Sequence, residues 1–167
     1  IHYNCSIEEQ VQMVKDVKRF ENGFITNPIV ISPDMTISKI MEIIDKMGFS
    51  GFPVTDTGKI GGKLIGILTR RDIETIFDTN TYNTILVKDI MTNEDLVTGL
   101  QGCELSEANK LLRSSRKGKL PIIDKNGNLV ALMSRKDLLT NDEFPLASKN
   151  PKTKQLLCGA TVGTRKE

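Results

Sequence analysis

Apolar and polar positions along the chain change period several times, and each change marks an expected element. Within residues 37–47, apolar side chains recur at spacings of three and four, which predicts an amphipathic helix. Thr36 is placed to cap the start of this helix, and Gly48 is placed to end it. Two apolar runs of strand length follow at 52–55 and 63–68, joined by a glycine-rich turn.

The same order of elements occurs a second time. Residues 64–73 read Leu-Ile-Gly-Ile-Leu-Thr-Arg-Arg-Asp-Ile, and residues 129–138 read Leu-Val-Ala-Leu-Met-Ser-Arg-Lys-Asp-Leu, an offset of 65. Upstream, Phe-Pro-Val-Thr-Asp at 52–56 matches Leu-Pro-Ile-Ile-Asp at 120–124 at an offset of 68. The three-residue difference falls in the turn after Asp56, where insertions are tolerated. The chain therefore contains two copies of one unit of roughly sixty residues.

Each copy is predicted to run strand–helix–strand–strand–helix. The first strands are expected in the apolar runs 28–31 and 96–97, and the closing helices near Arg71 and Lys136. A unit of this size buries little apolar surface alone, so the two copies are expected to share a core. The fold class is therefore α/β of the mixed (α+β) kind.

Segments outside the repeats carry their own patterns. Residues 6–21 are predicted to form an amphipathic helix whose start is a capping box of Ser6 and Glu9. The apolar run 156–162 is typical of a buried strand. Residues 145–151 contain proline and serine, and this composition predicts a linker.

Composition limits the class of protein. The chain is 38% hydrophobic and 26% charged, and its formal charge of +2 gives no argument for nucleic acid. No apolar run approaches the ~18 residues that a membrane helix needs, so no membrane partner is expected. Cys5, Cys103 and Cys158 lie far apart, which favours a reducing, cytoplasmic compartment over disulfides or a metal site. None of the cysteines is expected to be a catalytic nucleophile.

A hydroxyl and a carboxylate recur where the last strand of each copy ends. The two motifs are Thr69-Arg70-Arg71-Asp72 and Ser134-Arg135-Lys136-Asp137. One explanation is that the hydroxyl caps a helix while the Asp favours its positive end. The other is a nucleotide site, in which the Thr or Ser and the Asp bind ribose hydroxyls and the basic residues receive phosphates. Repetition of the whole motif favours the nucleotide site.

The two copies resemble a tandem pair of cystathionine-β-synthase (CBS) domains, the arrangement called a Bateman module. In that family the pattern Gly-hydrophobic-hydrophobic-[Thr/Ser]-x-x-Asp binds the ribose of purine nucleotides. Residues 66–72 fit it in full, and the second copy departs from it only in Ala131. Residues 87–92, Val-Lys-Asp-Ile-Met-Thr, are also similar to the opening of many second CBS domains.

Further segments narrow the resemblance to the inosine-5′-monophosphate (IMP) dehydrogenase family of eukaryotic type. These segments are 4–5, 23–28, 48–58, 117–121 and 154–160. In that family a catalytic (β/α)8 barrel is interrupted by a Bateman module. The resemblance implies barrel flanks at 1–26 and 145–167, and CBS domains at 27–84 and 85–144. It also implies hinges at 20–27 and 145–152.

The family's catalytic cysteine loop has no counterpart in this sequence. The chain alone is therefore expected not to be an enzyme, whereas the parent protein would be an NAD-dependent IMP dehydrogenase that uses a monovalent cation. As in the family, the module would bind ATP, GTP or GDP, with or without Mg²⁺, and regulate the barrel. Module–module contacts would form a homo-oligomer, a tetramer or octamer.

The resemblance also assigns binding residues. Ribose would be bound by Thr69, Asp72, Ser134 and Asp137. Phosphates would be bound by Arg70, Arg71, Lys117, Lys119, Arg135 and Lys136, and Arg116 belongs to the same basic set. Purine rings would lie against Ile29, Phe52, Pro53, Val97, Leu120 and Pro121.

Two alternatives to nucleotide regulation stay open. The module can serve assembly with its pockets empty, in which case the repeated motif only caps helices. A CBS pair from another nucleotide-sensing protein, such as a transporter or kinase subunit, would explain the repeat but not the flanking segments.

Overall fold

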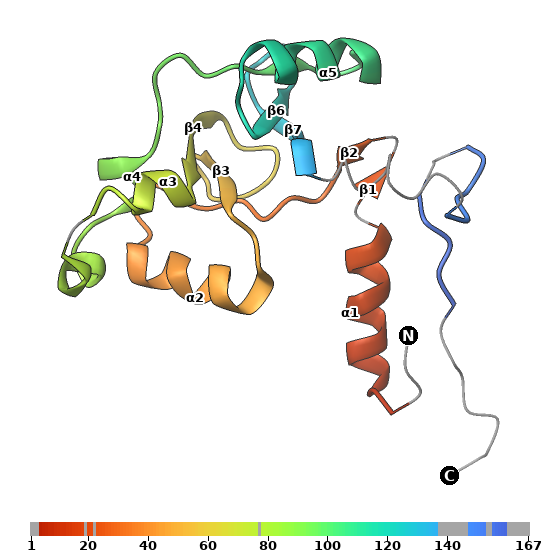
Figure 1. Cartoon of the computed structure of the whole chain (residues 1–167), viewed down its shortest axis with the longest axis horizontal. Coiled ribbons are helices and arrows are strands. Elements are labelled where there is room, and N and C mark those ends of the chain that lie inside the picture. The colour runs from red at the N-terminus through yellow and green to blue at the C-terminus, as the bar shows by residue number, and fades with distance from the viewer. Residues whose placement is uncertain are drawn as a thin grey trace.

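The structure is a computed structural model that describes residues 4–18, 20–21, 23–76, 78–136, 147–152 and 155–159 (Figure 1). Its elements in chain order are α1 (Ile7–Lys18), β1 (Phe20–Glu21), β2 (Phe24–Ile25), α2 (Ile37–Met47), β3 (Gly51–Thr55), β4 (Leu64–Thr69), α3 (Arg70–Ile73), the 3-10 helix η1 (Thr79–Asn83), α4 (Val87–Ile90), β5 (Gly99–Leu100), α5 (Leu105–Ser114), β6 (Lys119–Ile123) and β7 (Leu129–Ser134).

The two repeats share one hydrogen-bonding register, which confirms the duplication seen in the sequence. Hairpin β3–β4 pairs Gly51 with Thr69, and hairpin β6–β7 pairs Lys119 with Ser134. A parallel partner then adds to each hairpin, Ile31 beside Val54 and β5 beside β6. The apolar run 96–97 is not that partner, so its assignment as a strand was wrong. The strand is Gly99–Leu100, because the offset of 68 aligns Gly99 with Ile31.

Each repeat is completed by the segment that precedes the other one. Strand β2 precedes the first repeat and pairs with β7 of the second, with Ile25 opposite Leu132. Thr92 precedes the second repeat and pairs with Ile67 of β4 in the first. This exchange covers two strand edges that would otherwise expose unpaired backbone groups.

Gly66 is required by this exchange. A Cβ atom at Gly66 would lie 2.6 Å from Met91 Sδ and 3.1 Å from the Thr92 carbonyl oxygen. The glycine therefore lets the segment at residues 91–92 approach β4 closely enough to form two backbone hydrogen bonds with Ile67, both of 2.9 Å.

Helices α2 and α5 cover the two hairpins from opposite sides in Figure 1. Helix α2 buries Ile37, Ile40 and Ile44 against the first hairpin. Helix α5 buries Ala108 and Leu112 against the second. The predicted ends of α2 are confirmed, since Thr36 is extended and Gly48 is left-handed (φ 71°). The Thr36 hydroxyl, however, makes no capping hydrogen bond.

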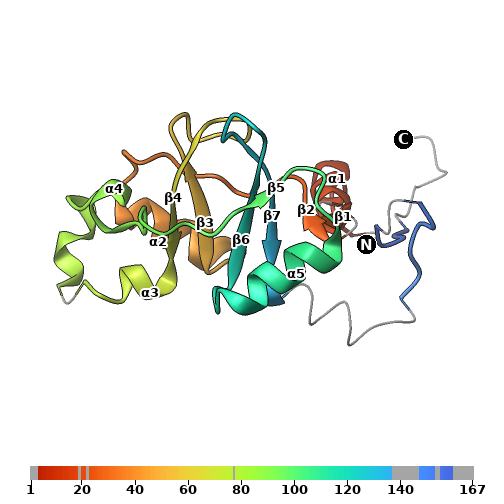
Figure 2. The same cartoon turned by 90° about the horizontal axis from the view of Figure 1, so that it is seen from above.

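The two hairpin turns lie side by side in Figure 2 and join the repeats. Leu64 N–H donates to the Gly127 carbonyl (3.0 Å), while Leu129 N–H donates to Gly62 and its carbonyl accepts from Gly61 (both 2.9 Å). Leu129 is fully buried. The repeats meet at these turns, but the expectation of one shared core is wrong for the described residues, because their buried apolar side chains form two clusters, one in each repeat.

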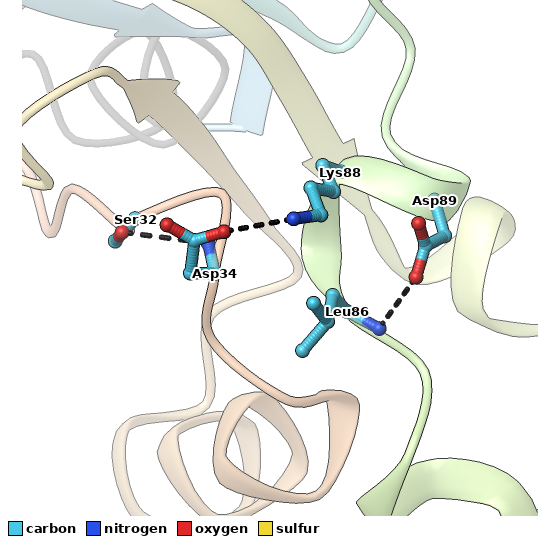
Figure 3. Close-up of polar contacts among 5 residues, drawn as sticks. All are labelled: Ser32, Asp34, Leu86, Lys88 and Asp89. Atoms are coloured by element: carbon cyan, nitrogen blue, oxygen red, sulfur yellow. Dashed lines mark hydrogen bonds and ion pairs between the residues drawn. The ribbon is translucent and has the colours of Figure 1, made fainter.

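The connection between the repeats is fixed to the loop before α2 (Figure 3). Lys88 Nζ donates to Asp34 Oδ1 (3.0 Å), the Asp34 N–H donates to Ser32 Oγ (3.4 Å), and the Leu86 N–H donates to Asp89 Oδ2 (2.9 Å). Both ion-pair partners are exposed, so this pair adds little stability. Its role is to orient the connection.

Helix α1 begins with the predicted capping box, but it ends at Lys18 and does not reach residue 21 as predicted, because Phe20–Glu21 pairs with β2 as strand β1. The Ser6 N–H donates to Glu9 Oε2 (2.8 Å), and the Glu9 N–H donates to Ser6 Oγ (3.2 Å). Its apolar side is uncovered, with Ile7 75% and Val11 46% exposed. None of the helices in the described part of the chain has the length and apolar character needed to span a membrane.

The prediction of a buried strand at 156–162 is wrong for the part that the structure describes, 156–159. Leu156 forms a single bridge with Lys149, and Leu157 is 57% exposed. No neighbouring strand covers this run among the described residues, so its apolar side chains have nothing to pack against. The run lies beside the end of α1, where Lys18 Nζ donates to the Leu156 carbonyl (2.9 Å).

Candidate functional site

A cleft of about 800 Å³ lies between the two repeats, where β4 and β7 end. It lies at the opposite ends of the hairpins from the joined turns, because strands β4 and β7 run from the turns to the cleft. Both repeats contribute to its wall, together with the segment that connects them. Its lining residues are Ser50, Ile67, Thr69, Arg70, Arg71, Asp72, Glu74, Thr92, Asp95, Leu96, Val97, Arg116, Lys117, Gly118, Lys119, Ser134, Arg135 and Lys136.

The Asp72 carboxylate is held by three donors at the edge of this cleft. The Thr69 N–H and hydroxyl donate to Asp72 Oδ2 at 2.6 and 2.7 Å, and the Thr92 hydroxyl donates to Oδ1 at 3.2 Å. The bond from the Thr69 N–H to Asp72 is one half of a capping box at the start of α3, but the Thr69 hydroxyl donates to the Asp72 carboxylate and makes no capping bond to the backbone. The predicted capping by the hydroxyl is therefore not found at Thr69, whereas Asp72 does lie in the first turn of the helix as predicted. The same carboxylate lines the cleft, so capping and ligand binding are compatible.

Ser134 occupies the equivalent strand end in the second repeat. It is only 2% exposed, and its hydroxyl accepts a hydrogen bond from Lys119 Nζ (3.3 Å). Asp137, the predicted carboxylate of this motif, lies outside the described residues. Among the described residues, the second repeat therefore supplies a hydroxyl and basic side chains to the cleft.

All six residues predicted to bind phosphate line the cleft, and Arg116 joins them. These seven cationic side chains face three acidic ones, Asp72, Glu74 and Asp95. Arg70 forms an exposed ion pair with Glu74 (3.3 Å). The excess of cationic groups favours an anionic ligand, because clefts lined by one sign of charge concentrate ions of the other.

Of the six residues predicted to contact a purine ring, one lines the cleft and five do not. Val97 lines the cleft. Phe52 and Leu120 are 2% and 0% exposed and belong to the cores of the first and second repeats. Pro53 and Pro121 are buried within β3 and β6, and Ile29 packs against the first core. All five lie off the cleft lining, and the prediction that they line the ligand site is wrong for this cleft; Phe52 and Leu120 are directed by β3 and β6 into the two cores.

Thr92, Asp95 and Leu96 line the cleft but were not among the predicted site residues. A repeated tripeptide could have identified Thr92. Ile-Thr-Asn at 25–27 matches Met-Thr-Asn at 91–93, and each lies in the segment that crosses to the other repeat. No comparable pattern marks Asp95.

The cysteines lie away from the cleft lining. Burial, and then the nearby Glu107 carboxylate, raises the pKa of the Cys103 thiol, which keeps it protonated at neutral pH. Cys158 is exposed, which corrects the expectation that an apolar strand surrounds it.

Comparison with known proteins identifies the repeats. The CBS domain family model matches residues 14–77 and 87–143. The chain belongs to the CBS domain family, as a tandem pair. This confirms the resemblance drawn from the sequence. Every lining residue of the cleft lies within the two matched ranges.

Similar proteins match the chain beyond its CBS domains as well, in the flanking segments. The chain is 51% identical over 99% of its length to inosine-5′-monophosphate dehydrogenase of Schizosaccharomyces pombe, and 50% identical over 99% to that of Toxoplasma gondii. It spans 31% and 29% of those proteins. The predicted likeness to the eukaryotic enzymes is therefore confirmed over the whole chain, which corresponds to under a third of each relative.

Solved structures of related sequence have a similar fold over nearly the whole chain. GMP reductase from Trypanosoma brucei in complex with guanosine 5′-triphosphate superposes with a TM-score of 0.81 at 31% identity, covering 99% of this chain and 39% of that one. The same protein in its C318A form, in complex with guanosine 5′-monophosphate, gives a TM-score of 0.80.

Proposed function

We propose that the chain is the regulatory nucleotide-binding module of an IMP dehydrogenase. In this proposal ATP, GTP or GDP binds between the repeats and controls the activity and oligomeric state of an enzyme that oxidises IMP to XMP. The parent enzyme would use NAD and a monovalent cation, and it would act in the cytoplasm. The module would occupy residues 27–144, divided at 84/85, between barrel flanks at 1–26 and 145–167.

The observation that carries the proposal is the placement of Asp72. Its carboxylate lies at the edge of a cleft lined by seven cationic groups, and two hydroxyl donors already saturate part of it. Ribose hydroxyls can replace the hydroxyls of Thr69 and Thr92 as donors, because these bonds are exchangeable and charge-assisted. Phosphates then extend toward Arg116, Lys117 and Lys119.

The relatives support the nucleotide class. One similar solved structure is a complex with guanosine 5′-triphosphate, and another is a complex with guanosine 5′-monophosphate. Identity of about half to IMP dehydrogenases over nearly the whole chain also favours this parent over a transporter or kinase subunit. The uncovered apolar side of α1 is consistent with packing on the catalytic barrel of such a parent.

Regulation requires that a nucleotide bind one arrangement of the module more tightly than another. Thr92 connects the nucleotide site to the arrangement of the repeats, because it bonds to Asp72 and lies in the segment that crosses between the repeats. A ribose that displaces its hydroxyl would act on that segment directly.

Calorimetric titration of this chain with ATP and with GTP tests the proposal. We expect saturable binding that weakens about tenfold or more in Asp72→Asn and in Asp137→Asn, since each loses a charged acceptor. Asp45→Asn, an exposed change on α2, is the control and should bind as the wild type does. A folded wild-type chain that binds neither nucleotide would overturn the proposal and leave the assembly role, with helix capping as the purpose of the motif.

A further inference from the structure

Two residues of the cleft have an unusual backbone. Asp95 (φ 49°) and Arg116 (φ 55°) are the non-glycine residues with left-handed φ in the described part of the chain, and both line the cleft. This conformation costs about 1–3 kcal/mol for most residues, although Asp tolerates it better than most. A strained backbone of this kind persists where the surrounding structure holds it in place. Here the two strained residues each place a charged side chain at the same cleft.

The Asp95 carboxylate is available to a ligand. The residue is exposed, and among the described residues its carboxylate has no hydrogen bond or ion pair. Asp72 and Glu74, the other acidic residues of the lining, are both engaged, by threonine hydroxyls and by Arg70 respectively. A carboxylate without a partner in a cleft that otherwise favours anions is not explained by phosphate binding.

Its position along the chain suits the base of a nucleotide whose ribose lies at Asp72. Thr92 donates to Asp72, and Asp95 follows three residues later, a separation of at most ~10 Å along the chain. Leu96 and Val97 come next and present apolar side chains to the same cleft. The segment thus offers in order a contact at the ribose anchor, a polar acceptor, and an apolar surface for a ring.

We propose that Asp95 reads the base and selects guanine over adenine. This inference rests on the proposed function, because it concerns the same cleft. A carboxylate only accepts hydrogen bonds. Guanine presents two adjacent donors, N1–H and the 2-amino group, whereas adenine presents an acceptor at N1 beside its 6-amino donor. Adenine would therefore place a lone pair against the carboxylate and leave one oxygen unpaired.

Titrations of this chain with GTP, ITP and ATP test the inference. ITP keeps N1–H but lacks the 2-amino group, so the expected order of affinity is GTP, then ITP, then ATP. In Asp95→Asn we expect the GTP:ATP affinity ratio to fall about tenfold, because one charged acceptor is lost. The ratio is the readout because removing a negative charge strengthens phosphate binding equally for all three nucleotides.

Glu74→Gln is the matched control, since it removes the same charge from the same cleft. It should change all three affinities alike and leave the ratio intact. Nucleotide binding that persists in Asp95→Asn with an unchanged GTP:ATP ratio would overturn the inference and leave the proposed function standing. A wild-type chain that binds none of the three would overturn both.

Discussion

Asp124 shows how one side chain stabilises the turn that joins the repeats. Its Oδ1 accepts from the N–H groups of Asn126 and Asn128 (both 2.8 Å), and its Oδ2 accepts from Asn128 Nδ2 (2.9 Å). The bonds from Asn128, backbone first, lower the pKa of the Asp124 carboxyl below its usual 3.8. The ionised form is therefore the one that the folded turn favours.

The sign of the pH dependence follows from that lowered pKa. Stability from Asp124 is fully present above pH 3.8, the ordinary value, and is lost as pH falls through the lower folded value. We expect Asp124→Asn to lower the urea midpoint at pH 7, with the difference from the wild type shrinking as the pH falls below 3.8. A difference that stays constant across this range would show that ionisation of Asp124 is irrelevant to the turn.

At the scale of the secondary-structure elements, Gly66 sets how closely β4 and the segment at residues 91–92 approach each other. Because a Cβ atom there meets Met91 and the Thr92 carbonyl, Gly66→Val should force β4 and the crossing segment apart. We expect a loss of about 1–3 kcal/mol in the free energy of unfolding, as overpacked sites show. Urea denaturation followed by circular dichroism measures it.

Gly118→Val is the control for that experiment. No heavy atom lies within 4 Å of the position that a Cβ atom would take at Gly118, so the Cβ of the new side chain meets nothing there. Equal losses in the two variants would indicate that the chemistry of glycine, rather than the close approach at Gly66, sets the cost.

For the whole molecule, the hydrogen-bonded turns predict that the two repeats unfold together. Leu129 is fully buried and bonds to Gly61 and Gly62 of the other repeat. Leu129→Ala should cost about 2–5 kcal/mol, as core truncations do. In a Tyr3→Phe background, Tyr82 fluorescence reports on the first repeat, because Tyr82 packs against its core.

In that background the fluorescence transition and the circular dichroism transition should coincide for wild-type and Leu129→Ala proteins alike. If the Tyr82 signal instead changed at a denaturant concentration distinct from the circular dichroism midpoint, the turns would not couple the repeats.

The sequence by itself determined the repeat, the hairpins, helix α2 and the start of α1, because periodicity and turn chemistry are local. The positions of α2 and of the capping box at Ser6 and Glu9 follow from spacings of three and four residues. It also led to Thr69, Asp72, Ser134 and the six basic residues that line the cleft, since the repeat brings them to both strand ends; their binding of ribose and phosphate stays a prediction.

Tertiary structure alone decided which side chains face the cleft. Phe52 and Leu120 belong to the cores, although the family resemblance had implied that they contact a purine ring. Thr92 and Asp95 reach the cleft because their segment crosses from one repeat to the other, a pairing between residues far apart in sequence. Local patterns carry no information about such crossings, since the packing of the two repeats against each other selects them.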